Sequence, residues 1–218
     1  MIAFFADNHY DARPGHHLNE KLNLQQTVIF AEDDMTQLPE LLEREDCQLL
    51  MLNWIGATCG LPHPGPEIER AVKAYLESGR PIMLLHGASA AFWEWSWWRD
   101  LVGLRWVRGE DPDGFAASTH PVRPYSVTVA KTRNPLAAKL KPFSLPTDEI
   151  YTNLEQTAPV SVLLETKIEE GTFPQAYTCQ SPYGGKIACF IPGHASHAFE
   201  SPELVHNAHV LIDYLLED

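Results

Sequence analysis

The sequence has few basic residues for its length. Its 218 residues include 16 Lys and Arg against 29 Asp and Glu, which gives a formal net charge of −13 with histidine neutral. A chain this acidic offers no positive surface to phosphate backbones or anionic lipids, so we expect neither nucleic-acid nor membrane partners. It also lacks any apolar run near the roughly 20 residues that cross a bilayer.

Cysteine is scarce as well. Cys47, Cys59, Cys179 and Cys189 form no Cys-x-x-Cys pair. Disulfide frameworks are typical of small secreted domains, so we interpret these four residues as reduced thiols. Residues 1–6 lack the basic start and the long apolar stretch of a signal peptide. We therefore expect a cytoplasmic protein.

Neither a GxGxxG nor a GxxxxGK[ST] element occurs, so nothing favours a dinucleotide or a nucleoside triphosphate as cofactor. The chain also has no internal repeat, no low-complexity tract and no convincing linker. Its length and its 44% hydrophobic residues are ample for one core. We predict a single domain over residues 1–218.

Short apolar runs alternate with amphipathic segments in the first half of the chain. The runs are residues 2–6, 27–31, 48–54 and 81–85. Continuous runs of this kind are typical of strands buried on both faces of a parallel sheet. Helices are predicted over 36–44 and from Pro66 to Gly79. The alternation predicts an α/β fold with a doubly wound, mostly parallel sheet and right-handed crossovers.

The second half is less regular. Residues 103–124 are rich in glycine, proline and charge, and we interpret them as an excursion across the surface. The elements predicted after them are strands at 125–130 and 159–164, a short helix from Asn134, an added β-hairpin of 175–180 with 186–191, and a terminal helix from Ser201.

Histidines follow three of the predicted strands. His9 comes after the first run, His86 after the fourth, and His194 after the last strand of the hairpin. Because ligands of open parallel sheets bind beyond the carboxyl ends of the strands, we expect these side chains in one pocket. Trp54, which ends the third run, would line it. With Glu149, the three histidines offer donors suited to zinc or another divalent ion, but the spacing does not require a metal.

The segment around His86 predicts a strand–turn–helix. Gly87 permits a sharp turn, and Ala88 and Ser89 are expected to begin a helix, as in a nucleophile elbow. A histidine at an elbow is suited to act as acid, base or metal ligand, but it is a poor covalent nucleophile. The alternative is a packed histidine that only shapes the turn.

Four of the six tryptophans lie between Trp93 and Trp98. On a helix they would dock against the sheet or form a subunit contact, which leaves a homo-oligomer open, and Trp93 is our candidate for facing a sugar ring. His197, three residues after His194, is a further candidate binding residue. Asp148 and Glu149 would point to opposite sides of an extended segment, so only one of them would enter the pocket.

Four short motifs resemble the ThuA-like (trehalose-utilisation) family, in the same order along most of the chain. They are Gly79-Arg80-Pro81-Ile82-Met83-Leu84-Leu85-His86-Gly87-Ala88 before an aromatic-rich segment, Asp148-Glu149-Ile150-Tyr151, Gly184-Gly185-Lys186-Ile187-Ala188-Cys189-Phe190 followed by Gly193-His194, and Phe199-Glu200-Ser201-Pro202-Glu203-Leu204.

This resemblance implies a class I glutamine amidotransferase-like fold, with a flavodoxin-like sheet, and a link to the utilisation of disaccharides or related sugars. Carried over by position, the motif residues here are His86, Gly87, Glu149, Tyr151, Gly193 and His194. One departure is Asn134-Pro135-Leu136, where the family usually has His-Pro-Ile.

Glutaminase activity is not expected. Amidotransferases of this fold need a cysteine at the elbow and a late His-x-Glu, whereas this chain has His86 and His194-Ala195-Ser196.

Two hypotheses follow. In the first, the protein is an enzyme on a disaccharide or keto-sugar: His86 and Glu149 exchange protons with the substrate, and His194 binds or polarises it. The residues expected to line its binding site are His9, Trp54, Gly87, Trp93, Tyr151, Gly193 and His197. In the second, the protein is a non-catalytic module that binds a sugar or metabolite, or a part of an assembly.

Overall fold

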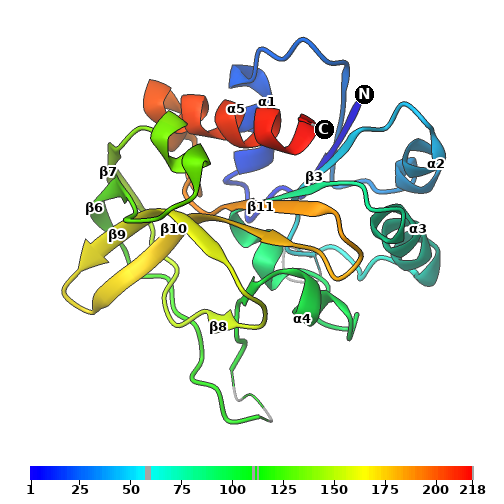
Figure 1. Cartoon of the computed structure of the whole chain (residues 1–218). Helices are drawn as coiled ribbons and strands as arrows, with labels where there is room; N and C mark the ends of the chain where they lie inside the picture. The colour runs from blue at the N-terminus through cyan, green and yellow to red at the C-terminus, as the bar shows by residue number, and fades with distance from the viewer. Residues whose placement is uncertain (57–59, 110, 112, 218) are drawn as a thin grey trace.

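A computed structural model describes residues 1–56, 60–109, 111 and 113–217 (Figure 1). Within this part of the chain, nine strands form the principal sheet. Their bounds are β1 (Ile2–Ala6), β2 (Val28–Glu32), β3 (Leu49–Asn53), β4 (Ile82–Leu85), β6 (Val122–Val129), β7 (Phe143–Glu149), β9 (Ser161–Ile168), β10 (Gly171–Gln180) and β11 (Lys186–Phe190). Two short strands, β5 (Leu104–Arg105) and β8 (Glu155–Gln156), pair separately.

The sheet has the order β2-β1-β3-β4-β11-β10-β9-β6-β7. The first five of these strands run parallel, and Phe4 of β1 lies opposite both Phe30 of β2 and Met51 of β3. Every residue of β1, β3 and β4 is buried, as expected for strands covered on both faces. The apolar runs of the first half thus predicted these strands within one or two residues.

The remaining strands are antiparallel. β10 pairs with β11 on one side and with β9 on the other, and β6 and β7 continue the sheet. β11 also pairs parallel with β4, where Ala188 lies opposite Met83. The two strands expected as an added hairpin are therefore integral to the main sheet, which is mixed, and an appended hairpin is not confirmed.

Helices cover both faces of the sheet. They are α1 (Pro14–Lys21), α2 (Leu38–Glu43), α3 (Pro66–Glu77), α4 (Trp98–Leu101) and α5 (Pro202–Leu216). Neighbouring residues of β1 point to opposite faces, so Phe4 packs in one core cluster with Leu18 of α1 and Leu211 of α5, and Phe5 packs in the other with Leu38 of α2 and Val72 of α3. Figure 1 shows α1 and α5 together on one side of the sheet, with α3 and α4 on the other.

The tryptophan-rich segment is not the helix that the sequence predicted. Residues His86–Ala90 form a single 3-10 helix, η1, and α-helix resumes only at Trp98. Phe92 lies between them with φ of 50°, in the left-handed region that an α-helix of L-residues cannot continue through. The expected helical pairs are replaced by a stack in which the ring centroids of Phe92 and Trp95 are 3.9 Å apart.

Three of the cysteines, Cys47, Cys179 and Cys189, are free thiols, whereas Cys59 lies outside the described residues. In the described part of the chain, none of the helices has the length and apolar character needed to cross a membrane.

Candidate functional site

Three strand ends bring three imidazoles together. His9 follows β1, His86 follows β4, and His194 follows β11. The ring centroids of His9 and His86 are 4.7 Å apart, those of His9 and His194 are 4.9 Å apart, and those of His86 and His194 are 5.2 Å apart. The strand order reverses between β1 and β3, and this is the point where open α/β sheets bind ligands. The sheet edge therefore gathers histidines that lie far apart in the sequence.

Glu149, the last residue of β7, completes the group. Its Oε2 lies 3.4 Å from His86 Nε2, and its Oε1 lies 3.5 Å from His194 Nδ1. One ligand atom from each of His9, His86, Glu149 and His194 lies within 4.8 Å of all the others. We call these four residues the histidine cluster.

A backbone carbonyl fixes the tautomer of His86. Its Nδ1 lies 2.8 Å from the carbonyl oxygen of Ile191, so Nδ1 carries a proton and donates it. The other nitrogen, Nε2, faces the cluster, 3.3 Å from His194 Nδ1 and 3.2 Å from the Tyr151 hydroxyl. His86 is thus oriented by the structure and does not merely fill the turn.

The elbow at His86 has the strain expected of a functional turn. His86 adopts φ of 45°, a left-handed conformation that is uncommon for residues other than glycine. A Cβ on Gly87 would lie 2.5 Å from Cγ1 of Ile55 and 3.1 Å from Cε1 of His9. Glycine at position 87 therefore lets His9 and Ile55 approach the elbow.

The charges of His86 and Glu149 support each other. Burial alone would raise the pKa of Glu149, but the hydrogen bond and charge of His86 outweigh it and lower that pKa to about 2. Burial alone would lower the pKa of His86, and Glu149 outweighs it so that the pKa is raised. Without a bound ion, the two side chains form a buried ion pair.

The two other imidazoles favour the neutral form. Burial, followed by the charge of His86, lowers the pKa of His194. Burial lowers the pKa of His9 to about 4 against the opposing effect of Asp7, and the charges of His86 and His194 add to the lowering. Neutral imidazoles are the form that binds metal ions.

Two buried aspartates hold loops at the site: Asp148 holds the loop of His194, and Asp7 holds the loop that follows β3. Asp148 is 2% exposed, and its two carboxylate oxygens accept hydrogen bonds from the backbone N–H groups of Gly193 (2.8 Å) and His194 (2.9 Å). Asp7, fully buried, accepts from the backbone N–H groups of Ile55 and Gly56 through Oδ2. Its Oδ1 lies 3.8 Å from His9 Nδ1. Of the two adjacent carboxylates, Glu149 lines the histidine pocket and Asp148 binds backbone N–H groups behind it.

An open pocket of about 230 Å³ lies over the cluster, and we call it the histidine pocket. His9, His194, Glu149 and Tyr151 form its polar floor, and His86 lies buried beneath them. Its other lining residues are Tyr10, Ile55, Ala90, Trp106, Arg108 and His120.

Three expected site residues lie elsewhere. Trp54 lines a separate pocket with Met35 and Ile68, and Trp93 lines another with Arg105. The Nε2 of His197 contacts the carbonyl oxygen of Thr147 outside the histidine pocket.

Gly193 contributes its backbone conformation to the site. It adopts φ of 110°, and a Cβ at this position would lie 2.9 Å from Cζ of Phe199. Both the backbone conformation and the close approach of the Phe199 ring therefore require glycine.

Sequence reasoning missed six lining residues of the histidine pocket, and three of them lie in residues 103–124, which it treated as a surface excursion. Trp106, Arg108 and His120 all belong to that segment, and His120 Nδ1 lies 3.1 Å from Glu149 Oε1. Asn134, which stands where the family usually has a histidine, instead caps a short helix through Leu136 N. The only signal for His120 was the His-Pro dipeptide that it forms with Pro121.

The fold and the site describe an α/β protein with a polar pocket at the carboxyl edge of a mixed sheet. A sequence profile of the ThuA family, described as trehalose utilisation, matches residues 8–211. The chain belongs to the ThuA family.

Solved structures share the fold at low sequence identity. A ThuA-like protein from Parabacteroides merdae is 16% identical with a TM-score of 0.69, and the match covers 95% of this chain and 88% of that one. A ThuA-like protein from Bacteroides uniformis gives the same identity and TM-score, with 99% and 91% covered. A cytoplasmic protein from Salmonella typhimurium is 11% identical with a TM-score of 0.64, and 98% of each chain is covered. No curated protein matches the sequence.

Proposed function

We propose that this ThuA-family protein is a carbohydrate-active enzyme whose histidine cluster binds a divalent metal ion, zinc-like in its preference for nitrogen donors. The observation that carries the proposal is the convergence of one ligand atom each from His9, His86, Glu149 and His194 within 4.8 Å. Three imidazoles and one carboxylate are a donor set typical of zinc sites.

The spacing of the donors supports a tetrahedral ion. With bonds of about 2.0–2.1 Å, tetrahedral ligands lie roughly 3.3 Å apart. His86 Nε2 lies 3.3 Å from His194 Nδ1 and 3.4 Å from Glu149 Oε2. These two contacts therefore need little rearrangement to accept an ion.

The groups behind the donors also fit a metal site. Metal-binding histidines commonly donate their second ring N–H to a carbonyl or a carboxylate. His86 donates to the Ile191 carbonyl, and His9 Nδ1 lies near the fully buried Asp7. Both His9 Nδ1 and Asp7 Oδ1 are buried and lack a hydrogen-bond partner in the described part of the chain, so a small rotation of the ring would satisfy both.

In this proposal, residues next to the histidine cluster transfer the protons. Sequence reasoning gave that role to His86 and Glu149, but as metal ligands His86 would have its Nε2 lone pair occupied and Glu149 would have its charge neutralised by the ion. His120 has a half-exposed side chain that contacts Glu149, and Tyr151 places its hydroxyl at His86 Nε2. Burial, followed by the charge of Glu149, raises the pKa of Tyr151, so its hydroxyl keeps its proton. A divalent ion would polarise a sugar hydroxyl or carbonyl oxygen and lower the pKa of bound water.

The family suggests the substrate class. Trehalose utilisation points to a disaccharide or a derivative of one, and the pocket pairs the Trp106 ring with polar groups that suit sugar hydroxyls. Glutaminase chemistry is not proposed, because His86 occupies the elbow. Burial raises the pKa of Cys189 to about 12 and that of Cys179 to about 11, so neither thiol favours the thiolate. A flavodoxin-like parallel half of the sheet and a cytoplasmic location are further parts of this proposal, supported by the strand order and the free thiols.

The metal content of protein purified without a histidine tag tests the proposal. We expect close to one zinc, manganese or other divalent ion per chain after incubation with each metal and removal of the excess. His86→Ala and Glu149→Gln should lose it. His206→Ala is the matched control, since that histidine lies on α5 and contacts the Lys139 carbonyl. Equal metal content in wild type and both cluster variants would overturn the proposal.

Product analysis with a sugar panel tests the enzymatic part. Trehalose, other disaccharides and their keto derivatives are incubated with metal-loaded protein and followed by chromatography and mass spectrometry. Conversion that is lost in His86→Ala and kept in His206→Ala supports an enzyme. Stoichiometric sugar binding without any product would instead favour the non-catalytic module.

A further inference from the structure

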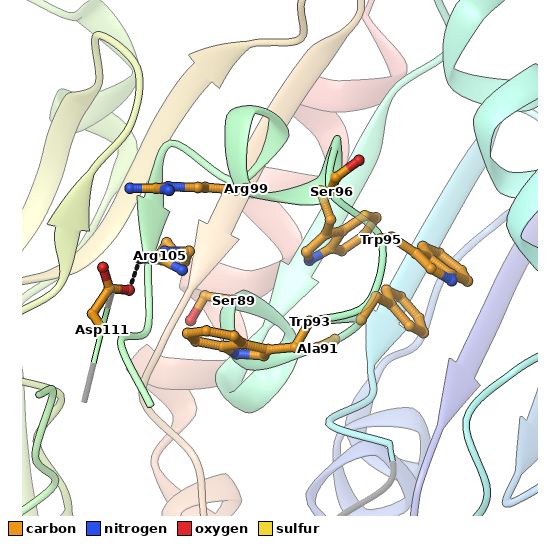
Figure 2. Close-up of a pocket in the computed structure, with 10 residues that line it drawn as sticks. Ser89, Ala91, Trp93, Trp95, Ser96, Arg99, Arg105 and Asp111 are labelled. Carbon is orange, nitrogen blue, oxygen red and sulfur yellow. Dashed lines mark hydrogen bonds and ion pairs between the residues drawn. The ribbon is translucent and has the colours of Figure 1, made fainter. Parts of the chain in front are cut away.

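The segment that follows β4 also lines a second pocket. This pocket encloses about 250 Å³, and we call it the tryptophan pocket. Its lining residues are Ser89, Ala91, Phe92, Trp93, Trp95, Ser96, Trp98, Arg99, Arg105 and Asp111. Figure 2 shows Ser89, Trp93, Arg105 and Asp111 toward one end of this pocket in the view, and Trp95 and Ser96 toward the other.

Two buried polar groups in this pocket lack a partner. The hydroxyl of Ser89 and the indole N–H of Trp98 are both buried, and neither has a hydrogen bond to any residue that the structure describes. Ser89 is 1% exposed and Trp98 is 2% exposed. Leaving such groups unpaired costs stability, and native proteins pair nearly all of them. Both residues line the same cavity, so a ligand in it would pair the two groups after small side-chain movements that expose them.

Charged side chains at one end of the pocket are held rigidly. Arg105 is 8% exposed, and it lies 2.6 Å from both Glu155 and Asp111 through two different nitrogens. Arg99 bridges Glu155 and Asp113 in the same way. Three carboxylates therefore balance the charge of these two guanidinium groups, which leaves them little attraction for an anionic ligand. Such fixed donors and acceptors are suited to a neutral molecule with several hydroxyls.

The apolar wall and the volume of the tryptophan pocket indicate which class of ligand fits it. The faces of Phe92 and Trp95 stack on each other, while Trp93 lies under Arg105, 4.7 Å from its ring centroid to the guanidinium carbon. Drug-sized ligands occupy sites of roughly 300–1,000 Å³, so a smaller pocket suits a single ring. Aromatic walls with a few fixed polar groups match a ring that is apolar on its C–H faces and polar at its edge, which describes a sugar.

The two pockets share a wall. Ala90 lines the histidine pocket and Ser89 the tryptophan pocket, and the backbone N–H of Trp106 donates to the Ser89 carbonyl. Arg108 lines the histidine pocket, and its guanidinium carbon lies 5.4 Å from the centroid of the Trp93 ring. A ligand in the tryptophan pocket would thus contact residues next to the candidate active site.

We propose that the tryptophan pocket is a second carbohydrate site, which binds one neutral sugar ring through Ser89, Trp98 and the Arg105–Asp111 pair. The sugar class rests on the proposed function, whereas the neutral, single-ring ligand follows from this pocket itself. Sequence reasoning gave Trp93 a sugar-facing role in the site of the histidines; the inference moves that role to a pocket of its own.

Titration calorimetry and tryptophan fluorescence test the inference, with glucose as the neutral probe and glucose 6-phosphate as the anionic one. We expect glucose to bind and to change the fluorescence, and glucose 6-phosphate to bind more weakly. Ser89→Ala and Trp98→Phe each remove one hydrogen-bonding group, so each should weaken glucose binding about three- to tenfold. The melting temperature of Ser89→Ala should not fall, because the hydroxyl that it removes is unpaired in the free protein. Trp98→Phe should melt lower, because it leaves a cavity in the core.

Matched controls are available in the chain. Ser144→Ala removes an exposed hydroxyl of β7, and Trp97→Phe removes an indole N–H that already donates to Glu69. Both should bind glucose like the wild type.

A variant of the histidine cluster separates this inference from the proposed function. His86→Ala should keep glucose binding in the tryptophan pocket within about twofold, since the pockets use different polar groups. If His86→Ala abolished glucose binding while Ser89→Ala and Trp98→Phe left it unchanged, the sugar would occupy the histidine pocket alone. That result would overturn the inference and leave the proposed function intact. The absence of glucose binding up to tens of millimolar, or tighter binding of glucose 6-phosphate, would also overturn it.

Discussion

Replacing Asp148 by Asn tests how the structure positions His194. The carboxylate is 2% exposed and accepts one backbone N–H from Gly193 and one from His194, through different oxygens. An asparagine keeps one acceptor oxygen but turns an N–H₂ group toward the second backbone N–H. One charged hydrogen bond, worth about 1.5–3 kcal/mol, is lost, and the other is weakened by the loss of charge. We expect the free energy of unfolding to fall by roughly 2–4 kcal/mol.

This loss has a measurable size. For a chain of about 200 residues, 1 kcal/mol corresponds to roughly 2–4 °C in melting temperature, so Asp148→Asn should melt roughly 4–16 °C below the wild type. Because the loop that supplies His194 would shift, zinc affinity should also fall about 10- to 100-fold. Scanning calorimetry of metal-free protein and zinc titration measure the two effects.

An exposed aspartate provides the control. Asp100 lies on the surface of α4, so Asp100→Asn should change neither quantity. If Asp148→Asn melted within about 2 °C of the wild type and bound zinc equally well, the role given to Asp148 would be refuted.

Three further changes have defined outcomes. Gly87→Ala places a Cβ 2.5 Å from Ile55 Cγ1 and 3.1 Å from His9 Cε1, so urea unfolding should show a loss of roughly 1–3 kcal/mol. His9 has a pKa of about 4 in the folded state, so the unfolded chain takes up its proton first as the pH falls below 6.5. Metal-free protein should thereby lose roughly 2 kcal/mol of stability between pH 7 and pH 5, a loss that His9→Asn should lack. Tyr151→Phe removes the hydroxyl 3.2 Å from His86 Nε2, and kcat on the identified sugar should fall about 100-fold while metal content is kept.

For each of these three predictions, a particular result would contradict it. Gly65→Ala is the control for position 87, because its Cβ would meet nothing within 4 Å, and an equal effect at both positions would remove the packing argument. An unchanged difference in stability between pH 7 and pH 5 in His9→Asn would mean that another group causes the acid sensitivity. If Tyr151→Phe kept full kcat, a residue other than Tyr151 would have to transfer the proton.

The sequence predicted the parallel half of the fold because that half obeys local rules. Strands buried on both faces must be apolar throughout, and Phe4 and Leu84 belong to such runs. The histidines could be grouped for the same reason, since strand order alone carries His9, His86 and His194 to one edge.

The features that the sequence did not predict depend on tertiary structure. Helix α1 is largely polar, so its short apolar face gave no clear periodicity, and the sequence analysis predicted no helix there. The tryptophan segment has helical spacing, but the left-handed Phe92 breaks it. His120 reaches Glu149 from a segment without regular structure, and no local pattern predicts where such a segment packs.

X-ray absorption at the zinc edge of the zinc-loaded protein tests the central claim most directly. The proposed site predicts nitrogen and oxygen neighbours at about 2.0–2.1 Å, with the multiple scattering of three imidazoles that His86→Ala reduces. A shell of water oxygens without imidazole scattering, or sulfur neighbours at about 2.3 Å, would show that the histidine cluster does not hold the metal.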